Sequence, residues 1–452
     1  MQNDHPLFCP NSSSYMITLS TIPASFSNFG LMILQRYIEK QSQPFEVLYR
    51  FGPVETADMM VVIPCYNEPD LIPSLRSLFQ CQRPQCGVAV IIVVNSADNA
   101  PAEAIARNKL TIEAVARWTG ETSPWFAVEL LHAAHLPHKW AGVGWARKIG
   151  FDRALWHFTH AAKADGWLVA FDADSTTLPN FLTEVEKAFI SQPKAHFFTI
   201  HFEHPLGETL PPHLLDGIIR YELHLRYLRL AMAWCGYPHS IHTVGSSMAV
   251  KASAYAMQGG MNRRKAGEDF YFLHKLVLLG HYGNINTTTI IPASRVSDRV
   301  PFGTGAALRK WDNGGDELLF SYSLESFALL KPFLEMAPSF YRLDKAAIRE
   351  RLNQLHHAVR DYILQGDTPD IITTLSLNCS DATVFERRLF HQINAFWIIR
   401  YLNTMAESAF PKRDVENEAH QLLSCCGYET SGTGHPLDLL NRYRQLDRQL
   451  GY

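Results

Sequence analysis

The stretch Gly166–Leu182, GWLVAFDADSTTLPNFL, decides the fold of this chain. An apolar run ends there in two aspartates, Asp172 and Asp174, with one residue between them. A short apolar run of this kind predicts a buried strand.

Strand and helix patterns alternate along the chain from residue 58 onward. Apolar, β-branched runs predict strands, and runs with one apolar face predict the helices between them. This order predicts an α/β fold with a mostly parallel sheet flanked by helices. The expected strands are 58–67, 87–96, 125–133 and 166–174, and the expected helices are 68–81, 101–118 and 144–158.

Polar residues follow three of these strands, at 64–68, 95–98 and 172–174. Ligands of open parallel sheets bind beyond the carboxyl ends of the strands, so we expect these residues to share one edge. A purely structural interpretation has to treat the three polar endings as unrelated turns.

The pair Asp172 and Asp174 is a candidate metal site. Alternate side chains of a strand point the same way, so the two carboxylates can converge. Their oxygens suit Mg²⁺ or Mn²⁺, with substrate phosphate oxygens completing the shell. The alternative is that Asp174, Ser175 and Thr176 cap the helix that follows.

A second acidic pair, Glu268 and Asp269, begins a predicted helix that Gly280 closes. One interpretation is that the two acids favour the positive end of the helix dipole. The other is that one of them is a general base for a hydroxyl acceptor.

The composition indicates a globular protein of 452 residues, long enough for more than one core. A net charge of −3 gives no reason to expect nucleic acid or an anionic membrane as the main partner. Eight scattered cysteines without zinc spacing favour reduced thiols. No apolar run approaches the roughly 20 residues of a membrane span, and no signal peptide is recognised. We therefore expect a cytoplasmic protein, with peripheral association at the inner membrane face left open.

The pattern predicts three segments: a lead-in at 1–55, an α/β domain at 56–320 and a helical region at 321–452. The lead-in is expected to hold one helix at 28–42, and a further helix is expected at 212–232. Three long helical stretches are expected near the C-terminus, at 317–337, 344–364 and 382–408. These C-terminal helices are a candidate acceptor platform or homodimer interface.

Six motifs in order resemble those of family 2 glycosyltransferases. They are VVIPCYNEPDLIPSLRSL, IIVVNSADN, GVGWARKIGFDRAL, WLVAFDADSTTLPNFL, VGSSMAVKASAYAMQGGMN and GEDFYFLHKLVLLG, between about residues 57 and 300. The resemblance implies a GT-A fold, a nucleotide-sugar donor, a divalent metal, and an inverting displacement with a carboxylate base.

The resemblance also implies roles for individual residues. Asp174 would hold the metal, with Asp172 at the ribose or the metal, and Asp269 would be the base, with Glu268 orienting the sugar or acceptor. The small residues Gly245, Ser246 and Ser247 would line the sugar and acceptor site. The other donor-binding residues would be Pro64, Tyr66, Glu68, Asn95, Arg147 and Ala173.

The sequence departs from the family pattern in three places. Asn95 stands where the family has an acid, for which Asp98 is a candidate substitute, and Lys148 replaces an asparagine. The late histidine that many relatives use as a third metal ligand has no clear counterpart.

A loop with Arg295, Ser297 and Arg299 is a candidate binding site for a pyrophosphate, and FGTG after it would let the loop close.

Three other functions are compatible with parts of this pattern. A retaining transferase of the same fold would need no base at Asp269. A nucleotidyltransferase would carry a Gly-rich basic loop after the first strand, and IPCYNEPD has neither Gly nor Lys. A non-catalytic protein that binds nucleotide sugars or carbohydrate would not need the three aspartates. The expected function is metal-dependent transfer from a UDP- or GDP-sugar to a carbohydrate or other hydroxyl.

Overall fold

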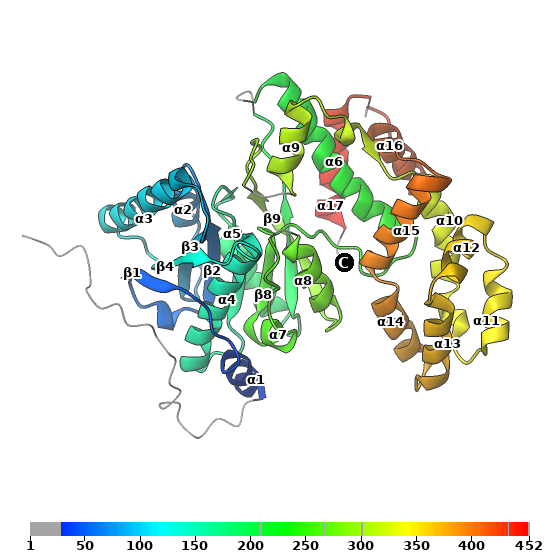
Figure 1. The fold of residues 1–452 in the computed structure, drawn as a ribbon, viewed down its shortest axis with the longest axis horizontal. Coiled ribbons are helices and arrows are strands. Elements are labelled where there is room, and N and C mark those ends of the chain that lie inside the picture. The colour runs from blue at the N-terminus through cyan, green and yellow to red at the C-terminus, as the bar shows by residue number, and fades with distance from the viewer. Residues whose placement is uncertain (1–28, 208–209, 266, 300–301, 433, 451–452) are drawn as a thin grey trace, which may run out of the picture. The chain divides into compact units, whose positions relative to one another are not determined.

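The computed structural model describes residues 29–207, 210–265, 267–299, 302–432 and 434–450 (Figure 1). Contacts within the chain divide it into two units. The first unit is Met1–Asp174 with Val250–Glu268, and the second is Ser175–Ala249 with Asp269–Tyr452. Neither unit is one continuous stretch of chain. The three predicted segments stay a prediction, and residues 1–28 of the lead-in lie outside the described residues.

The first unit contains the predicted parallel strands. Their order is β1-β4-β3-β2-β5, and all pairs are parallel except β1 with β4. All side chains of β2 are buried, as a strand covered on both faces requires. The strands are β1 (Glu46–Phe51), β2 (Met59–Cys65), β3 (Val88–Ala97), β4 (Ala127–Leu136) and β5 (Trp167–Ala170).

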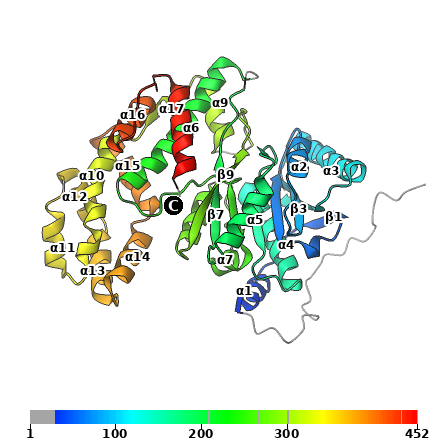
Figure 2. The same ribbon diagram turned by 180° about the vertical axis from the view of Figure 1, so that it is seen from behind.

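Helix α4 packs on β2 and β3 through a glycine. A Cβ atom at Gly150 would lie 2.3 Å from Cγ1 of Val62, so no larger residue fits there without a shift. Hydrogen bonds from Tyr37 and Tyr255 to Asp152 join α1, α7 and α4. The helices of this unit are α1 (Phe29–Ile38), α2 (Ile72–Phe79), α3 (Ala102–Thr122), α4 (Val143–His160) and α7 (Ala252–Met257), with the 3₁₀ turn η1 (Val54–Thr56) (Figures 1 and 2).

The second unit has its own strands, in the order β7-β9-β6. Strand β7 is parallel to β9, and β6 is antiparallel to it. The elements are β6 (Thr176–Thr177), α5 (Phe181–Ser191), β7 (Phe197–Phe202), α6 (Pro212–Trp234), α8 (Glu268–Val277), β9 (Tyr282–Ile291) and α9 (Thr304–Asp312). Along the chain, the division between the units falls within β8 (Met248–Lys251) and after Glu268, the first residue of α8.

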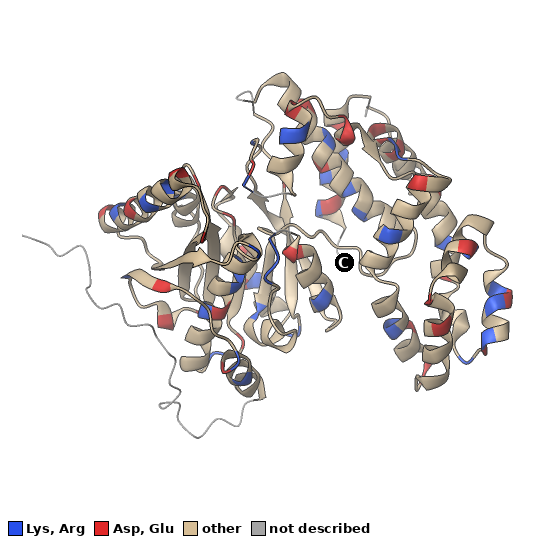
Figure 3. Cartoon of the chain, in the orientation of Figure 1, with Lys and Arg blue, Asp and Glu red and all other residues tan. Residues whose placement is uncertain are grey.

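The C-terminal part is helical, as predicted, and shares one apolar core with α6. Leu223 and Tyr227 of α6 belong to the same buried cluster as Phe327 and Tyr401. Acidic and basic residues are interspersed over these helices (Figure 3). The elements are η2 (Glu317–Leu319), β10 (Phe320–Ser321), α10 (Leu324–Glu335), η3 (Ala337–Phe340), α11 (Lys345–Leu352), α12 (His357–Gln365), α13 (Thr368–Asn378), α14 (Ala382–Gln392), α15 (Ala395–Ser408), β11 (Arg413–Asp414), α16 (Val415–Cys425) and α17 (Pro436–Gln449).

The three long C-terminal helices expected from the sequence are wrong in detail. Each is interrupted by a residue whose side chain accepts a hydrogen bond from a backbone N–H and so starts a new helix. Ser323 accepts from Glu325, and Asn394 accepts from Trp397. His356 starts α12 in the same way. Periodicity does not register such caps, because apolar residues on either side keep the same spacing.

Within the described part of the chain, no helix combines the length and apolar character needed to cross a bilayer.

Candidate functional site

The carboxyl ends of the parallel strands in the first unit carry the predicted polar residues. Pro64 pairs with Val93 near the end of β2. Asn95 is among the last residues of β3 that pair with β4. Asp172 and Asp174 follow the end of β5. Because β2, β3 and β5 are parallel, these residues occupy the same edge, as expected.

Asn108 of α3, which the sequence did not indicate, forms hydrogen bonds at two of these strand ends. Its Oδ1 accepts a 2.9 Å hydrogen bond from the N–H of Asn67, and its Nδ2 donates a 2.9 Å bond to the carbonyl of Asn95. Asn67 has a φ of +48°, a conformation in which asparagine is tolerated better than most residues. Glu68 is buried and accepts from the N–H of Asp70, so the loop after β2 is held in one form.

Arg147 of α4 joins both acidic pairs. Its side chain is only 1% exposed. One terminal nitrogen lies 2.6 Å from Oδ1 of Asp172, and the other donates to Oε1 of Glu268. The resemblance assigned Arg147 to the donor, and the geometry shows its guanidinium engaged by two carboxylates. One positive and two negative charges leave this triplet with a formal charge of −1.

Burial dominates the electrostatics of Glu268. Burial raises the pKa of this carboxyl above the usual 4.5. The positive charge of Arg147 acts to lower this pKa, and the negative charge of Asp172 acts to raise it. The carboxyl therefore gives up its proton less readily than an exposed glutamate.

Two glycines at the start of α4 allow the chain to approach Glu268. A Cβ atom at Gly144 would lie 2.4 Å from the carbonyl oxygen of Arg264 and 2.9 Å from Cβ of Glu268. At Gly142 it would lie 2.6 Å from Cα of Lys265. The motif GVGWAR thus owes its glycines to the close packing of Arg264, Lys265 and Glu268 on the helix.

The side chains around Asp174 fit a Mg²⁺ site with one or two carboxylate ligands better than a site in which the protein supplies every ligand. Across the described residues, no three His, Cys, Asp or Glu side chains gather as a metal cage would require. Mg²⁺ commonly uses one or two carboxylates and takes phosphate oxygens and water for the rest. Asp172 and Asp174, both partly exposed at the strand end, fit that pattern. The carbonyl of Ala173 between them accepts a 2.8 Å bond from Oγ of Ser74, which holds this turn.

His274, one of two late histidines, is committed to packing. It is buried, its ring centroid lies 4.5 Å from that of Phe270, and burial lowers its pKa to about 4. His281, the other, is exposed and precedes β9.

Three predicted residues, Ser246, Ser247 and Asp269, belong to the second unit. Ser246 and Ser247 are buried, and among the described residues their hydroxyls have no hydrogen-bond partner. Buried hydroxyls are usually satisfied, so this pair next to Gly245 calls for an explanation such as a ligand or water. Asp269 accepts a 2.7 Å hydrogen bond from the N–H of Phe270 in the first turn of α8.

The arginine loop folds onto the start of α9. The N–H and Nε of Arg299 both donate to Oγ of Ser297, whose own N–H donates to the carbonyl of Gly305. Arg295 lies two residues before Ser297 in the same loop. Trp311 anchors α9 to α6, because its Nε1 donates to the carbonyl of His213 at 2.7 Å.

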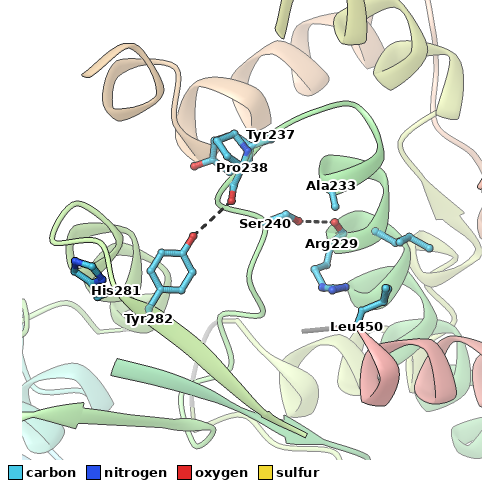
Figure 4. Close-up of a pocket in the computed structure, with 9 residues that line it drawn as sticks. Arg229, Ala233, Tyr237, Pro238, Ser240, His281, Tyr282 and Leu450 are labelled. Carbon is cyan, nitrogen blue, oxygen red and sulfur yellow. Dashed lines mark hydrogen bonds between the residues drawn. The ribbon is translucent and has the colours of Figure 1, made fainter. Parts of the chain in front are cut away.

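A cavity of about 360 Å³ in the second unit is lined by His281 but by none of the residues predicted to bind the donor, the acceptor or a metal (Figure 4). Its lining includes Arg229, Tyr237, Tyr282 and Leu450. Tyr282 is the first residue of β9, so the cavity lies at the beginning of that strand. Arg295 follows the opposite end of this ten-residue strand, roughly 30 Å away along it.

Comparison with known proteins gives no family. No family model matches the chain, and no curated protein matches it. Among solved structures, residues 1–349 of S. aureus TarS in complex with UDP match at 12% identity and a TM-score of 0.34, over 76% of this chain and 91% of that one. The complex with UDP-GlcNAc matches at 11% identity and a TM-score of 0.36, over 76% and 92%. The function is therefore argued from the residues of this chain.

Proposed function

We propose that this protein is a glycosyltransferase that moves a sugar from a nucleotide-diphosphate sugar to an acceptor hydroxyl. The observation that carries the proposal is the position of Arg147. Its buried side chain hydrogen-bonds Asp172 and Glu268, so three of the six motifs that resemble family 2 glycosyltransferases meet at one guanidinium. Unrelated helix caps would have no reason to share a buried partner.

The donor would lie at the carboxyl edge of the first unit. Pro64, Tyr66, Glu68 and Asn95 would border the nucleoside of a UDP- or GDP-sugar. Asp174, with Asp172, would hold Mg²⁺ or Mn²⁺, which when bound neutralises charge on the pyrophosphate. In this proposal Arg147 is a positioning residue, because both of its terminal nitrogens are engaged by carboxylates.

The acceptor hydroxyl would be activated by Asp269. Its carboxylate takes the hydroxyl proton as the acceptor oxygen bonds to the anomeric carbon, and the bond from that carbon to the nucleotide phosphate breaks with inversion. The hydrogen bond from the N–H of Phe270 fixes the orientation of this carboxylate. Arg295 and Arg299 would supply positive charge to the departing pyrophosphate.

The alternatives predict different products. A retaining transferase would keep the anomeric configuration, and a non-catalytic binding protein would bind nucleotide without turnover. A cytoplasmic or peripheral location and a homodimer through the C-terminal helices stay predictions from the sequence.

The test begins with thermal unfolding in the presence of UDP, GDP, CDP or dTDP, each with and without Mn²⁺. A ligand at 100 times its Kd stabilises the folded state by about 2.7 kcal/mol, so specific binding is measurable. One nucleotide should give a metal-dependent shift that Asp174→Asn loses. The matched control is Asp165→Asn, since the side chain of Asp165 is 82% exposed. Asp269→Asn should bind donor without transferring sugar, and full inverting transfer by this variant would refute the base assignment.

A further inference from the structure

Two surface segments of the first unit, residues 137–142 before α4 and residues 263–265 after α7, lie against each other. A Cβ atom at Gly142 would lie 2.6 Å from Cα of Lys265. Nζ of Lys265 lies 3.4 Å from Nε2 of His138. The two segments therefore form one surface, which we call the basic face; it consists of His138, Lys139, Trp140, Arg263 and Lys265.

The basic face carries a local excess of positive charge. Lys139, Arg263 and Lys265 are its cations. The first of the two segments follows Leu136, whose carbonyl accepts a 2.9 Å hydrogen bond from the N–H of Asp98. Three cations against the carboxylate of Asp98 leave a formal charge of +2, whereas the whole chain has a net charge of −3. A negatively charged group is thus attracted to this face although the chain as a whole is slightly acidic.

Aromatic rings hold two of these cations in place. The guanidinium of Arg263 lies 4.9 Å from the ring centroid of Trp145, which is buried and donates from Nε1 to Oε1 of Gln43 at 2.9 Å. Nζ of Lys139 lies 4.8 Å from the ring centroid of Trp140, which is 41% exposed. A cation that is already ordered loses less conformational entropy on binding an anion. This order distinguishes the basic face from an ordinary solvated surface of lysines and arginines.

The basic face borders the candidate site. A Cβ atom at Gly144 would lie 2.4 Å from the carbonyl oxygen of Arg264 and 2.9 Å from Cβ of Glu268. Glu268 and Asp172 both bond Arg147, and this triplet has a formal charge of −1. An anionic group is repelled by the triplet and attracted to the basic face, whereas a hydroxyl can donate to a carboxylate. A molecule that has both groups would therefore lie with its anion on the basic face and its hydroxyl toward the acidic residues.

We propose that the basic face binds the acceptor through oxyanion groups, phosphate or carboxylate, that lie close to the reacting hydroxyl. Lys139, Arg263 and Lys265 pair with these groups, and Trp140 packs on the part of the acceptor between them. An anionic membrane surface fits less well, because it takes a face with several apolar side chains and the basic face has one, Trp140. This inference rests on the proposed function and adds the charge of the acceptor.

The first experiment measures binding of fluorescein-labelled dextran sulfate to the full-length protein by fluorescence anisotropy, with unsulfated dextran as the neutral match. The wild type should bind dextran sulfate, more weakly as salt is added, and should not bind dextran. The triple variant Lys139→Gln, Arg263→Gln, Lys265→Gln should raise the Kd by about 10- to 100-fold, since it removes three unit charges from contact with the polymer.

The control makes the same change in net charge elsewhere in the first unit. Its substitutions, Arg107→Gln, Lys109→Gln and Arg117→Gln, replace exposed residues of α3 and should change the Kd by no more than about twofold. An equal loss of binding in the two triple variants would overturn the inference, because only the overall charge would matter. Binding of the wild type to vesicles that contain phosphatidylglycerol, without binding to dextran sulfate, would also overturn it, in favour of a membrane surface.

The second experiment compares two acceptors that differ by one phosphate. With the nucleotide sugar chosen by the thermal screen, the wild type should transfer sugar about 10-fold or more faster to 2-hydroxyethyl phosphate than to ethylene glycol. The triple variant of the basic face should lose this preference. Equal wild-type rates for the two acceptors would overturn the inference.

Nucleotide binding separates the inference from the function that it rests on. The triple variant of the basic face should keep the metal-dependent thermal shift of the wild type. Loss of that shift would assign the basic face to the donor and overturn the inference, while the glycosyltransferase proposal would stand. Binding of dextran sulfate through the basic face by a wild type that responds to none of the four nucleotides would instead overturn the proposed function and leave an oxyanion site.

Discussion

The ion triplet of Arg147, Asp172 and Glu268 makes a quantitative prediction. Arg147→Met removes the guanidinium while keeping much of the volume of its stem. The side chains of Arg147 and Glu268 are 1% and 3% exposed, so the variant leaves a buried carboxylate without its counter-charge. Breaking such a pair costs about 3–5 kcal/mol. Asp172 is 35% exposed, and solvent screening limits its share to at most about 1 kcal/mol.

The pH dependence of this loss has a definite sign. In the folded wild type the pKa of Glu268 is raised, so its contribution to stability is full below the unfolded value of about 4.5 and is lost as pH rises through the folded pKa. Without Arg147 the folded pKa rises further, because the protonated carboxyl avoids an unpaired charge. The variant should therefore lose most stability at pH 8 and progressively less toward pH 5.

Urea unfolding followed by circular dichroism at pH 5, 6.5 and 8 measures both effects. Adding Glu268→Gln to Arg147→Met should restore about 2 kcal/mol or more at pH 8, since it removes the orphaned charge. Arg107→Met on the exposed face of α3 is the control and should change stability by no more than about 0.5 kcal/mol. A loss below about 1 kcal/mol at pH 8, or a loss that grows toward pH 5, would refute the reasoning.

Three further predictions concern packing and acid stability. Gly144→Ala should cost about 1–3 kcal/mol in a thermal scan, because its Cβ would lie 2.4 Å from the carbonyl of Arg264; an unchanged Tm would contradict this. Gly217→Ala should displace Trp311, whose Cδ1 would lie 2.6 Å from the new Cβ, and a wild-type fluorescence spectrum would show that it does not. Burial acts to raise the pKa of Glu203, but its histidine and arginine partners lower it to about 2. The stability that Glu203 contributes should persist above about pH 4.5 and disappear as pH falls toward 2, so Glu203→Gln should flatten acid unfolding measured by circular dichroism.

The sequence was most informative where burial is continuous. The expected strand at 58–67 contains β2, Met59–Cys65, and the expected strand at 87–96 nearly coincides with β3, Val88–Ala97. Every residue of β2 is buried, so its apolar run reports its environment directly. Helix breaks such as the one at Asn394 escaped prediction because they depend on one side chain that bonds a local N–H.

The sequence predicts which candidate site residues lie at the ends of strands. It does not predict which of them contact one another. Asp172 and Asp174 follow from the end of one strand. The partnership of Arg147 with Glu268 spans 121 residues, and no local pattern indicates it. Asn108 was missed for the same reason, since it looks like an ordinary polar residue on a helix until its distant partners are known. The metal, the base and the donor stay predictions.

The long separation within the ion triplet also affects how the protein is made. Asp172 follows Arg147 by 25 residues, whereas Glu268 follows it by 121. At a synthesis rate of 5–20 residues per second, the second carboxylate appears roughly 6–24 s after the arginine. During that interval the sheet of the first unit can form around β2 and β3, but α4 lacks the segment that packs on its glycines. The nascent chain would thus expose the start of α4, with the charge of Arg147 only partly balanced, until Arg264, Lys265 and Glu268 leave the ribosome.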